Sequence, residues 1–255
     1  MLAWPLPPEI VLWVAQLVTP LHARHAWRLL PLLRGLLFAR GRRTVAAWLR
    51  AAGLGSDFKR YYYFLGALGR QTGFVASLLL RRVADVVAPG ERILLGLDDT
   101  PTKRYGPHVE GAGIHHNPTP GPADQKFLYG HIWVTIAWLA HHPRWGTIGL
   151  PLRALLYVRA KDVVWLMLLY RIGFRTKLAM AAELVLWAAD WLRYLGKVLW
   201  VVTDGAYAKR PFLQAARAAG VVVVSRLRKD AALWSVPVPP RPGAPTRRGR
   251  PPTYG

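Results

Sequence analysis

Residues 92–100 read Arg-Ile-Leu-Leu-Gly-Leu-Asp-Asp-Thr, and the pattern of this stretch decides the fold. Its apolar run has the length of a buried strand and ends at the adjacent carboxylates Asp98 and Asp99. Far downstream, residues 198–203 form a second apolar strand candidate, and Asp204 follows it directly. We therefore expect two strands that each carry a carboxylate to one edge of a sheet.

Carboxylates that meet at a sheet edge repel each other unless a cation lies between them. Hard oxygen ligands of this kind suit Mg²⁺ or Mn²⁺. The sequence therefore predicts a divalent metal site between the two strand ends.

The charge balance indicates a partner. Lys and Arg together number 35 against 13 Asp and Glu, which gives a formal net charge of +22. Such an excess favours a polyphosphate partner such as nucleic acid, although a chain with solvated basic faces and no such partner is the alternative. The chain has no cysteine, which excludes disulfides and thiolate-bound zinc or iron–sulfur centres and fits a reducing cytoplasm.

A mean hydropathy of +0.16 and 12 Trp suggest a membrane protein as an alternative class. The longest apolar runs argue against it, because residues 10–18 are interrupted by Gln16 and residues 163–170 are flanked by charges. Neither reaches the roughly 18 apolar residues that a spanning helix needs. The first residues also lack the early positive charge of a signal peptide. We expect a cytoplasmic protein without membrane contact.

Changes in composition divide the chain into three parts. Residues 1–88 are expected to form a helical DNA-binding region. Residues 89–230 alternate strand and helix patterns and are expected to form an α/β core. Residues 231–255 are basic and rich in proline, which is typical of a tail or linker.

Within the first part, residues 45–52 and 57–65 are helix candidates separated by the short turn of residues 53–56. This is the outline of a helix-turn-helix that reads a DNA groove, although plain packing within a helical bundle is the preferred interpretation of the pattern alone. The basic residues predicted to contact nucleic acid are Arg42, Arg43, Arg50, Lys59, Arg60, Lys103, Arg104 and Lys126.

In the middle part, a long polar loop at residues 101–125 follows the strand that ends at Asp98, Asp99 and Thr100. We expect two antiparallel strands next, at residues 127–139 and 147–158, and then a helix at residues 178–195. After the Asp204 strand, a helix at residues 208–219 and a strand at residues 221–225 complete a parallel crossover unit.

Two other groups could in principle bind metal or act in catalysis. His115, His116 and Asn117 are adjacent on the predicted loop, where adjacent residues seldom chelate one ion, so a solvated or DNA-contacting loop is preferred. Glu183 and Asp190 share one face of the predicted helix, and a solvated face is the preferred interpretation.

The predicted element order is that of a ribonuclease-H-like fold, a mixed sheet with flanking helices, preceded in this chain by an all-helical region. Three blocks carry a closer resemblance. They are Leu-Asp-Asp-Thr-Pro-Thr-Lys-Arg-Tyr-Gly at residues 97–106, Asp-Gln-Lys-Phe-Leu-Tyr-Gly at 124–130 and Val-Thr-Asp-Gly-Ala-Tyr at 202–207. With these blocks the chain resembles the DDE transposases of bacterial insertion sequences.

The resemblance implies double-stranded DNA at the element ends as substrate, a homodimer on that DNA, and phosphodiester hydrolysis and strand transfer with two Mg²⁺ or Mn²⁺ ions. It assigns the first acid to Asp99, with Asp98 as the close alternative, and the second acid to Asp204. The family's third acid, a Glu on a later helix, has no match, since the only acid after Asp204 is Asp230. We therefore expect a truncated transposase that does not complete strand transfer.

Two other function classes remain as alternatives. A non-catalytic DNA-binding remnant shares the fold and differs in its use of metal. A phosphatase with an aspartyl nucleophile needs a second Asp two positions after the first, and Thr100 and Pro101 stand at those positions in this chain. The phosphatase is therefore the weaker alternative.

Overall fold

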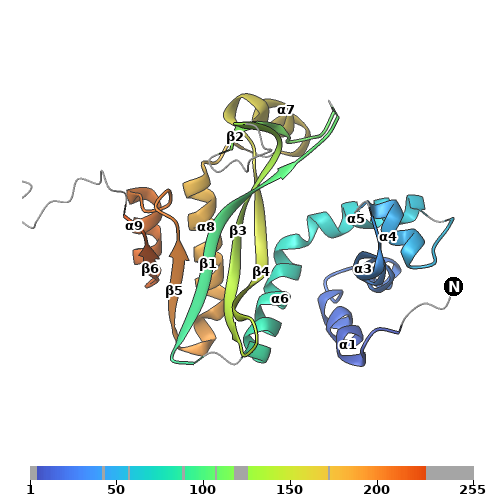
Figure 1. Cartoon of the computed structure of the whole chain (residues 1–255), viewed down its shortest axis with the longest axis horizontal. Helices are drawn as coiled ribbons and strands as arrows, with labels where there is room; N and C mark the ends of the chain where they lie inside the picture. The colour runs from blue at the N-terminus through green and yellow to red at the C-terminus, as the bar shows by residue number, and fades with distance from the viewer. Residues whose placement is uncertain are drawn as a thin grey trace, which may run out of the picture.

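The computed structural model describes residues 5–41, 44–56, 58–87, 90–106, 108–117, 126–171 and 173–227. Helices form the first part of the chain, and a mixed sheet with helices packed on it forms the rest (Figure 1). The first helices are α1 (Pro8–Leu17), α2 (Ala23–Ala26), α3 (Leu29–Phe38), α4 (Val45–Ala51), α5 (Phe58–Arg70) and α6 (Thr72–Val87). The strands are β1 (Arg92–Lys103), β2 (Gly113–His116), β3 (Phe127–His142), β4 (Gly146–Tyr157), β5 (Val198–Thr203) and β6 (Val222–Ser225). The later helices are α7 (Ala160–Tyr170), α8 (Lys177–Leu192), the short 3₁₀ helix η1 (Arg193–Leu195) and α9 (Arg210–Ala218).

The helix pair α4 and α5 follows the local signals in the sequence. Thr44 caps α4 by accepting a hydrogen bond from the Ala47 backbone N–H at 3.2 Å, as its position before the apolar residues predicts. Gly53, at φ +80°, occupies the left-handed conformation that follows the end of α4. The two helices share a buried cluster with α1 and α3, whose members include Leu49 and Phe64. The two helices predicted in this region are confirmed.

The sheet has the predicted mixed topology. β1 pairs parallel with β5 and antiparallel with β3, and β6 pairs parallel with β5. β4 pairs antiparallel with β3. The strand order β4-β3-β1-β5-β6, with three antiparallel strands followed by two parallel ones, is consistent with the expected ribonuclease-H-like fold.

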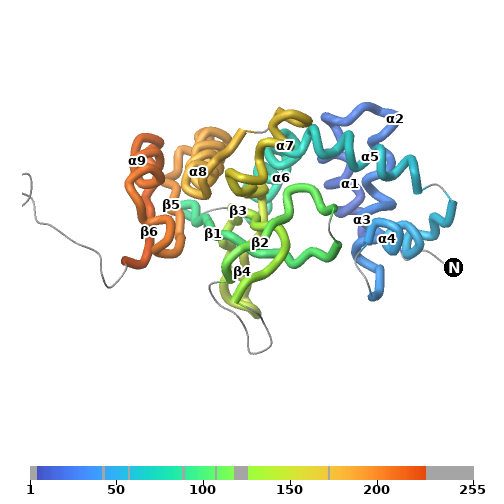
Figure 2. Tube along the Cα trace, turned by 90° about the horizontal axis from the view of Figure 1, so that it is seen from above, coloured from blue at the N-terminus to red at the C-terminus, as the bar shows by residue number. Residues whose placement is uncertain are grey.

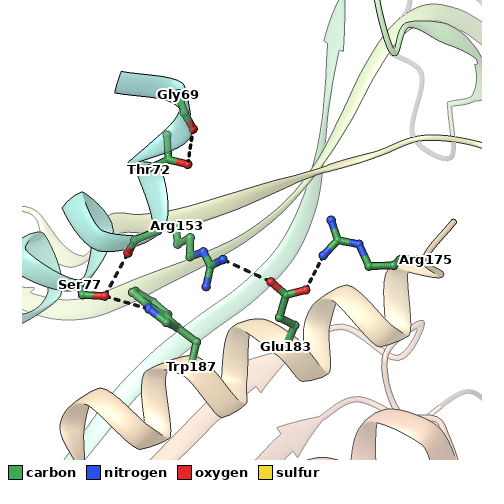
Figure 3. Close-up of polar contacts among 8 residues, drawn as sticks. Gly69, Thr72, Ser77, Arg153, Arg175, Glu183 and Trp187 are labelled. Atoms are coloured by element: carbon green, nitrogen blue, oxygen red, sulfur yellow. Dashed lines mark hydrogen bonds and ion pairs between the residues drawn. The ribbon is translucent and has the colours of Figure 1, made fainter. Parts of the chain in front are cut away.

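One face of the sheet is covered by helices. Ile93, Leu95 and Leu97 alternate along β1 into a core that α8 and α9 close, and in Figure 2 these two helices lie on the same side of the strands. α6 packs on α8 and β4, where the Trp187 indole N–H donates to the Ser77 hydroxyl at 3.2 Å (Figure 3). The sheet face that carries Asp98 has no such cover among the described residues, and we call it the open face. The face on which α8 and α9 pack is called the helix-covered face.

The prediction that the first strand ends at its acids is wrong. β1 continues through Asp98 and Asp99 to Lys103, which pairs with Gly130 of β3. What ends at this level is β5, whose last pair joins Thr203 to Leu97. From that point, among the described residues, β1 is paired only with β3. Proline is tolerated in a strand paired on one side, which explains why Pro101 does not stop β1.

The predicted long loop at residues 101–125 is also partly wrong. Residues 101–103 belong to β1, and β2 forms at Gly113–His116 and pairs with β3. Residues 107 and 118–125 lie outside the described residues. His115 is buried rather than solvated, because β2 turns alternate side chains inward, and Asn117, which follows β2, is buried as well.

Helix α7 was not predicted from the sequence, although its 11 residues form a regular helix. No helix among those described is both long and apolar enough to span a membrane.

Candidate active site

The carboxylates of β1 and β5 meet where the two strands separate. Leu97 and Thr203 form the last pair of the parallel ladder, so Asp98 and Asp204 are the next residues on adjacent strands. Asp98 and Asp204 line one hollow on the open face, together with Thr100 and other residues of β1, β3 and β5. Two of the predicted site residues, Asp98 and Asp204, therefore lie beside one hollow, and Asp98 rather than Asp99 is the acid of β1 that lines it.

Asp99 lies on the helix-covered face, because successive residues of a strand point to opposite faces. Its Oδ2 accepts a hydrogen bond from the Lys177 ammonium at 2.6 Å, and its Oδ1 accepts one from the Tyr207 hydroxyl at 3.0 Å. Lys177 begins α8, and Tyr207 follows β5. The carboxylate that the sequence placed first is thus engaged by two protein groups.

The electrostatics of this corner reflect three neighbouring carboxylates. The pKa of Asp98 is raised above its ordinary value, first by partial burial and then by the charges of Asp99 and Asp204, although part of the side chain is exposed. Burial and the charge of Asp99 raise the pKa of Tyr207 as well. Tyr207 therefore keeps its proton and donates to Asp99.

Asp204 is held by a tight turn at the end of β5. Its Oδ1 accepts from the Ala206 backbone N–H at 2.9 Å. Its carbonyl oxygen accepts from the Tyr207 N–H at 3.2 Å and from the Ser225 hydroxyl at 2.9 Å. Short side-chain contacts of this type fix an aspartate at the start of a turn. The carboxylate consequently has a defined position relative to Asp98.

The fit of a divalent cation can be judged from these donors. Asp98 and Asp204 present carboxylate oxygens to the open face, and their mutual repulsion would be relieved by a cation. Within the described ranges, no group of three or more histidine and acidic side chains is arranged to hold a metal. The residues therefore fit a cation held by two acids, while Lys177 already balances the third.

Glu183 forms ion pairs on the exposed side of α8. In Figure 3 it lies between Arg153 of β4 and Arg175, which precedes α8. The distance from Arg153 Nη2 to Glu183 Oε1 is 3.3 Å. Asp190 instead pairs with Arg193 at the exposed end of α8. Glu183 thus fastens α8 to β4, although its side chain is still 37% exposed on the face that was predicted to be solvated.

The histidine pair does not form a chelate. His115 is buried and His116 is exposed, since neighbouring residues of β2 face opposite ways. The pKa of His115 is lowered, first by burial and then by the positive charges of Arg159 and Lys177. His115 is therefore a neutral core residue, and the expectation of a solvated loop at this position is wrong.

The basic residues predicted to contact DNA fall into two groups. Arg50 and Lys59 belong to α4 and α5, where they lie over Phe58 and Tyr63 at 5.6 Å and 6.0 Å from the ring centroids. Arg60 is exposed on α5. The other group, Lys103, Arg104 and Lys126, is exposed at the far ends of β1 and β3, where Arg104 Nε donates to His131 Nδ1 at 3.1 Å. Arg42 and Arg43 lie outside the described residues.

Lys177 and Tyr207 are the functional candidates that sequence reasoning missed. Tyr207 closes the Val-Thr-Asp-Gly-Ala-Tyr block, three residues after Asp204, so its neighbourhood to the acid was visible. Lys177 gave no local signal, because only the packing of α8 brings it to a strand 78 residues earlier.

Comparison with known families agrees with this geometry. The family model described as DDE superfamily endonuclease matches residues 16–145 and 170–255, which is most of the chain. The chain belongs to the DDE superfamily endonucleases. A search of the curated proteins finds no match. DDE superfamily endonucleases act on DNA and generally use divalent metal ions. Residues 146–169, which form β4 and most of α7, lie between the two matched stretches.

Proposed function

We propose that this DDE endonuclease is an insertion-sequence transposase that cleaves DNA at the corner formed by Asp98 and Asp204. The observation that carries the proposal is the meeting of these two acids on the open face, at the point where β1 and β5 stop pairing. Asp98 replaces Asp99 as the proposed metal-binding acid of β1, because both oxygens of Asp99 already accept hydrogen bonds.

In this proposal Asp98 and Asp204 hold Mg²⁺ or Mn²⁺. A bound divalent cation would supply Lewis-acid polarisation of the phosphodiester and a more acidic water or hydroxyl nucleophile. The residues themselves present fixed carboxylates on a sheet face that a DNA backbone can approach. Lys177 lies on the helix-covered face, where its ion pair with Asp99 reduces the negative charge that a phosphate approaching the open face would meet.

DNA binding is proposed for the helical region, residues 1–88, with α4 and α5 as a helix-turn-helix. The net charge of +22 and the exposed basic residues of α5 support phosphate contacts. Residues 89–230 are proposed as the catalytic core, and the proposed tail, residues 231–255, lies outside the described residues. A dimer on DNA and a cytoplasmic location stay predictions.

Nicking of supercoiled plasmid DNA tests the proposal. The chain should convert supercoiled to open-circular DNA with Mg²⁺ or Mn²⁺ and not with EDTA, and Asp98→Asn and Asp204→Asn should each remove this activity. Lys161→Met, which removes one exposed positive charge on α7, is the matched control and should nick normally. Nicking that survives Asp204→Asn would contradict the proposed site.

A second candidate is DNA binding without cleavage. The observation that favours it is the small acid set, since among the described residues only Asp98 and Asp204 face the hollow as carboxylates. Two acids hold one ion well and a second one poorly. Salt-dependent binding of duplex DNA, with no metal-dependent nicking by the purified chain, would establish this candidate instead.

A further inference from the structure

We propose that Asp99, Lys177 and Tyr207 form a clamp on the helix-covered face that positions Asp98 and Asp204 on the open face. In this inference Asp99 is a positioning residue and not a metal ligand. The inference rests on the proposed function, because it is tested by measuring how tightly Asp98 and Asp204 bind a divalent cation.

The clamp joins three segments at one carboxylate. Tyr207, from the turn after β5, and Lys177, from the start of α8, donate to different oxygens of Asp99 at 3.0 Å and 2.6 Å. Tyr207 is 2% exposed and packs edge-on against Phe212, so its hydroxyl is directed by the core. A donor held this firmly fixes the direction of the carboxylate that accepts from it.

The clamp bridges the same two segments that carry the open-face acids. Asp98 is the chain neighbour of Asp99, and the Tyr207 N–H donates to the Asp204 carbonyl oxygen. The backbone ladder between β1 and β5 ends one residue earlier, at Leu97 and Thr203. The bond between the side chains of Asp99 and Tyr207 therefore continues the connection between the strands at the level of Asp98 and Asp204.

Lys177 gives the clamp a second effect. Three adjacent carboxylates repel one another, and the ammonium beside Asp99 balances one of the charges. Asp98 and Asp204 form no such ion pair with another described residue, and they are the pair open to a cation. The two consecutive aspartates thus have different roles, since Asp99 positions the site and Asp98 faces the cation.

Mn²⁺ binding to the whole chain tests the clamp, with free Mn²⁺ counted by electron paramagnetic resonance. Tyr207→Phe and Asp99→Ala should each raise the Mn²⁺ dissociation constant by roughly tenfold, the usual effect of losing contacts that orient ligands. The double variant should bind no more weakly than Asp99→Ala. Asp99→Asn, whose amide oxygen still accepts from Tyr207, should lose less than Asp99→Ala.

Conservative variants and controls separate positioning from general damage. Lys177→Arg should keep the Mn²⁺ dissociation constant of the natural chain, while the dissociation constant of Lys177→Met should differ from it. Tyr194→Phe removes the hydroxyl of an exposed residue in η1 and should leave Mn²⁺ binding unchanged. If Tyr207→Phe or Asp99→Ala does not fold, the comparison of Mn²⁺ binding between Lys177→Arg and Lys177→Met tests the clamp instead.

Each of the following results would overturn the clamp. A loss of Mn²⁺ binding in Asp99→Asn as complete as in Asp98→Asn would make Asp99 a ligand. Unchanged binding in Tyr207→Phe, or in Lys177→Met, would leave nothing for the clamp to position. If the natural chain binds no Mn²⁺, the proposed function itself is contradicted. The clamp is then tested by the free energy of unfolding, and losses in Tyr207→Phe and Asp99→Ala that add up in the double variant would reject it.

Discussion

The two halves of β1 are made differently. Residues 92–97, which we call the two-sided half, all pair with β5, and residues 95–97 pair with β3 as well; alternate side chains of this half are buried. Residues 98–103, the one-sided half, pair only with β3 among the described residues, and most of their side chains are exposed. The acids stand at the first two positions of the one-sided half. The difference shows that the site lies where β5 ends beside a β1 that continues, rather than where both strands end.

The largest expected effect comes from the two-sided half. Leu95→Ala empties a position that is 0% exposed in the core, and it should lower the free energy of unfolding by about 2–5 kcal/mol. Thr100→Ala, in the one-sided half, should cost less than about 1 kcal/mol because its side chain is exposed. Urea denaturation of both variants measures the contrast, and equal losses would erase the distinction between the halves.

The pairing of the one-sided half can be broken at Gly130. A Cβ at this residue would lie 2.1 Å from the Thr102 carbonyl oxygen, so β1 and β3 would have to move apart. Gly130→Ala should cost about 1–3 kcal/mol, the range for overpacking a close contact. Gly149→Ala is the control, since its nearest contact at 3.9 Å leaves room for a methyl group. A Gly130→Ala chain that melts with the natural one would show that the two strands separate at no cost.

A smaller effect is expected where α8 is fastened to β4. Glu183→Gln removes the charge that faces Arg153 and Arg175, and because these groups are partly exposed it should cost about 0.5–1 kcal/mol. Asp190→Asn, at an exposed pair, should cost nothing measurable. Thermal melts at low and high salt would compare them, and a loss at Asp190 as large as at Glu183 would contradict the fastening role of Glu183.

The smallest expected effect is a change with pH at His115. Because the pKa of this buried histidine is lowered in the folded chain, the unfolded chain binds the proton more readily, and stability should fall as pH drops below about 6.5. His115→Phe should flatten this acid limb, whereas His116→Phe, at an exposed position, should not. Melting temperatures between pH 5 and 8 measure it, and identical acid limbs in the two variants would reject the assignment.

The sequence predicted the two-sided half well, because an apolar run of strand length and the Asp204 strand are local patterns. It also predicted the order of strands and helices from β3 to β6, apart from α7, since each of these elements has its own periodicity and its own stop signal. It misplaced the end of β1, because Asp-Asp-Thr-Pro resembles a strand end and only the pairing with β3 carries the strand on to Lys103.

The choice between Asp98 and Asp99 could not be made from the sequence. Both follow the same apolar run, and what separates them is the face to which each points. That face is set by the register of β1 with β5, and the partners of Asp99 come from residues 177 and 207. Contacts over such separations leave no local pattern.

Asp98 and Asp204, and not Asp99, are proposed to hold a divalent cation on the open face. The most direct measurement is the rise in melting temperature of the natural chain and of Asp98→Asn and Asp99→Asn when saturating Mn²⁺ is added. We expect Asp98→Asn to lose this rise and to be at least as stable as the natural chain without metal, because a repelling charge has gone. We expect Asp99→Asn to keep most of the rise and to be less stable without metal. A rise that persists in Asp98→Asn and disappears in Asp99→Asn would contradict the assignment of Asp98 as the ligand.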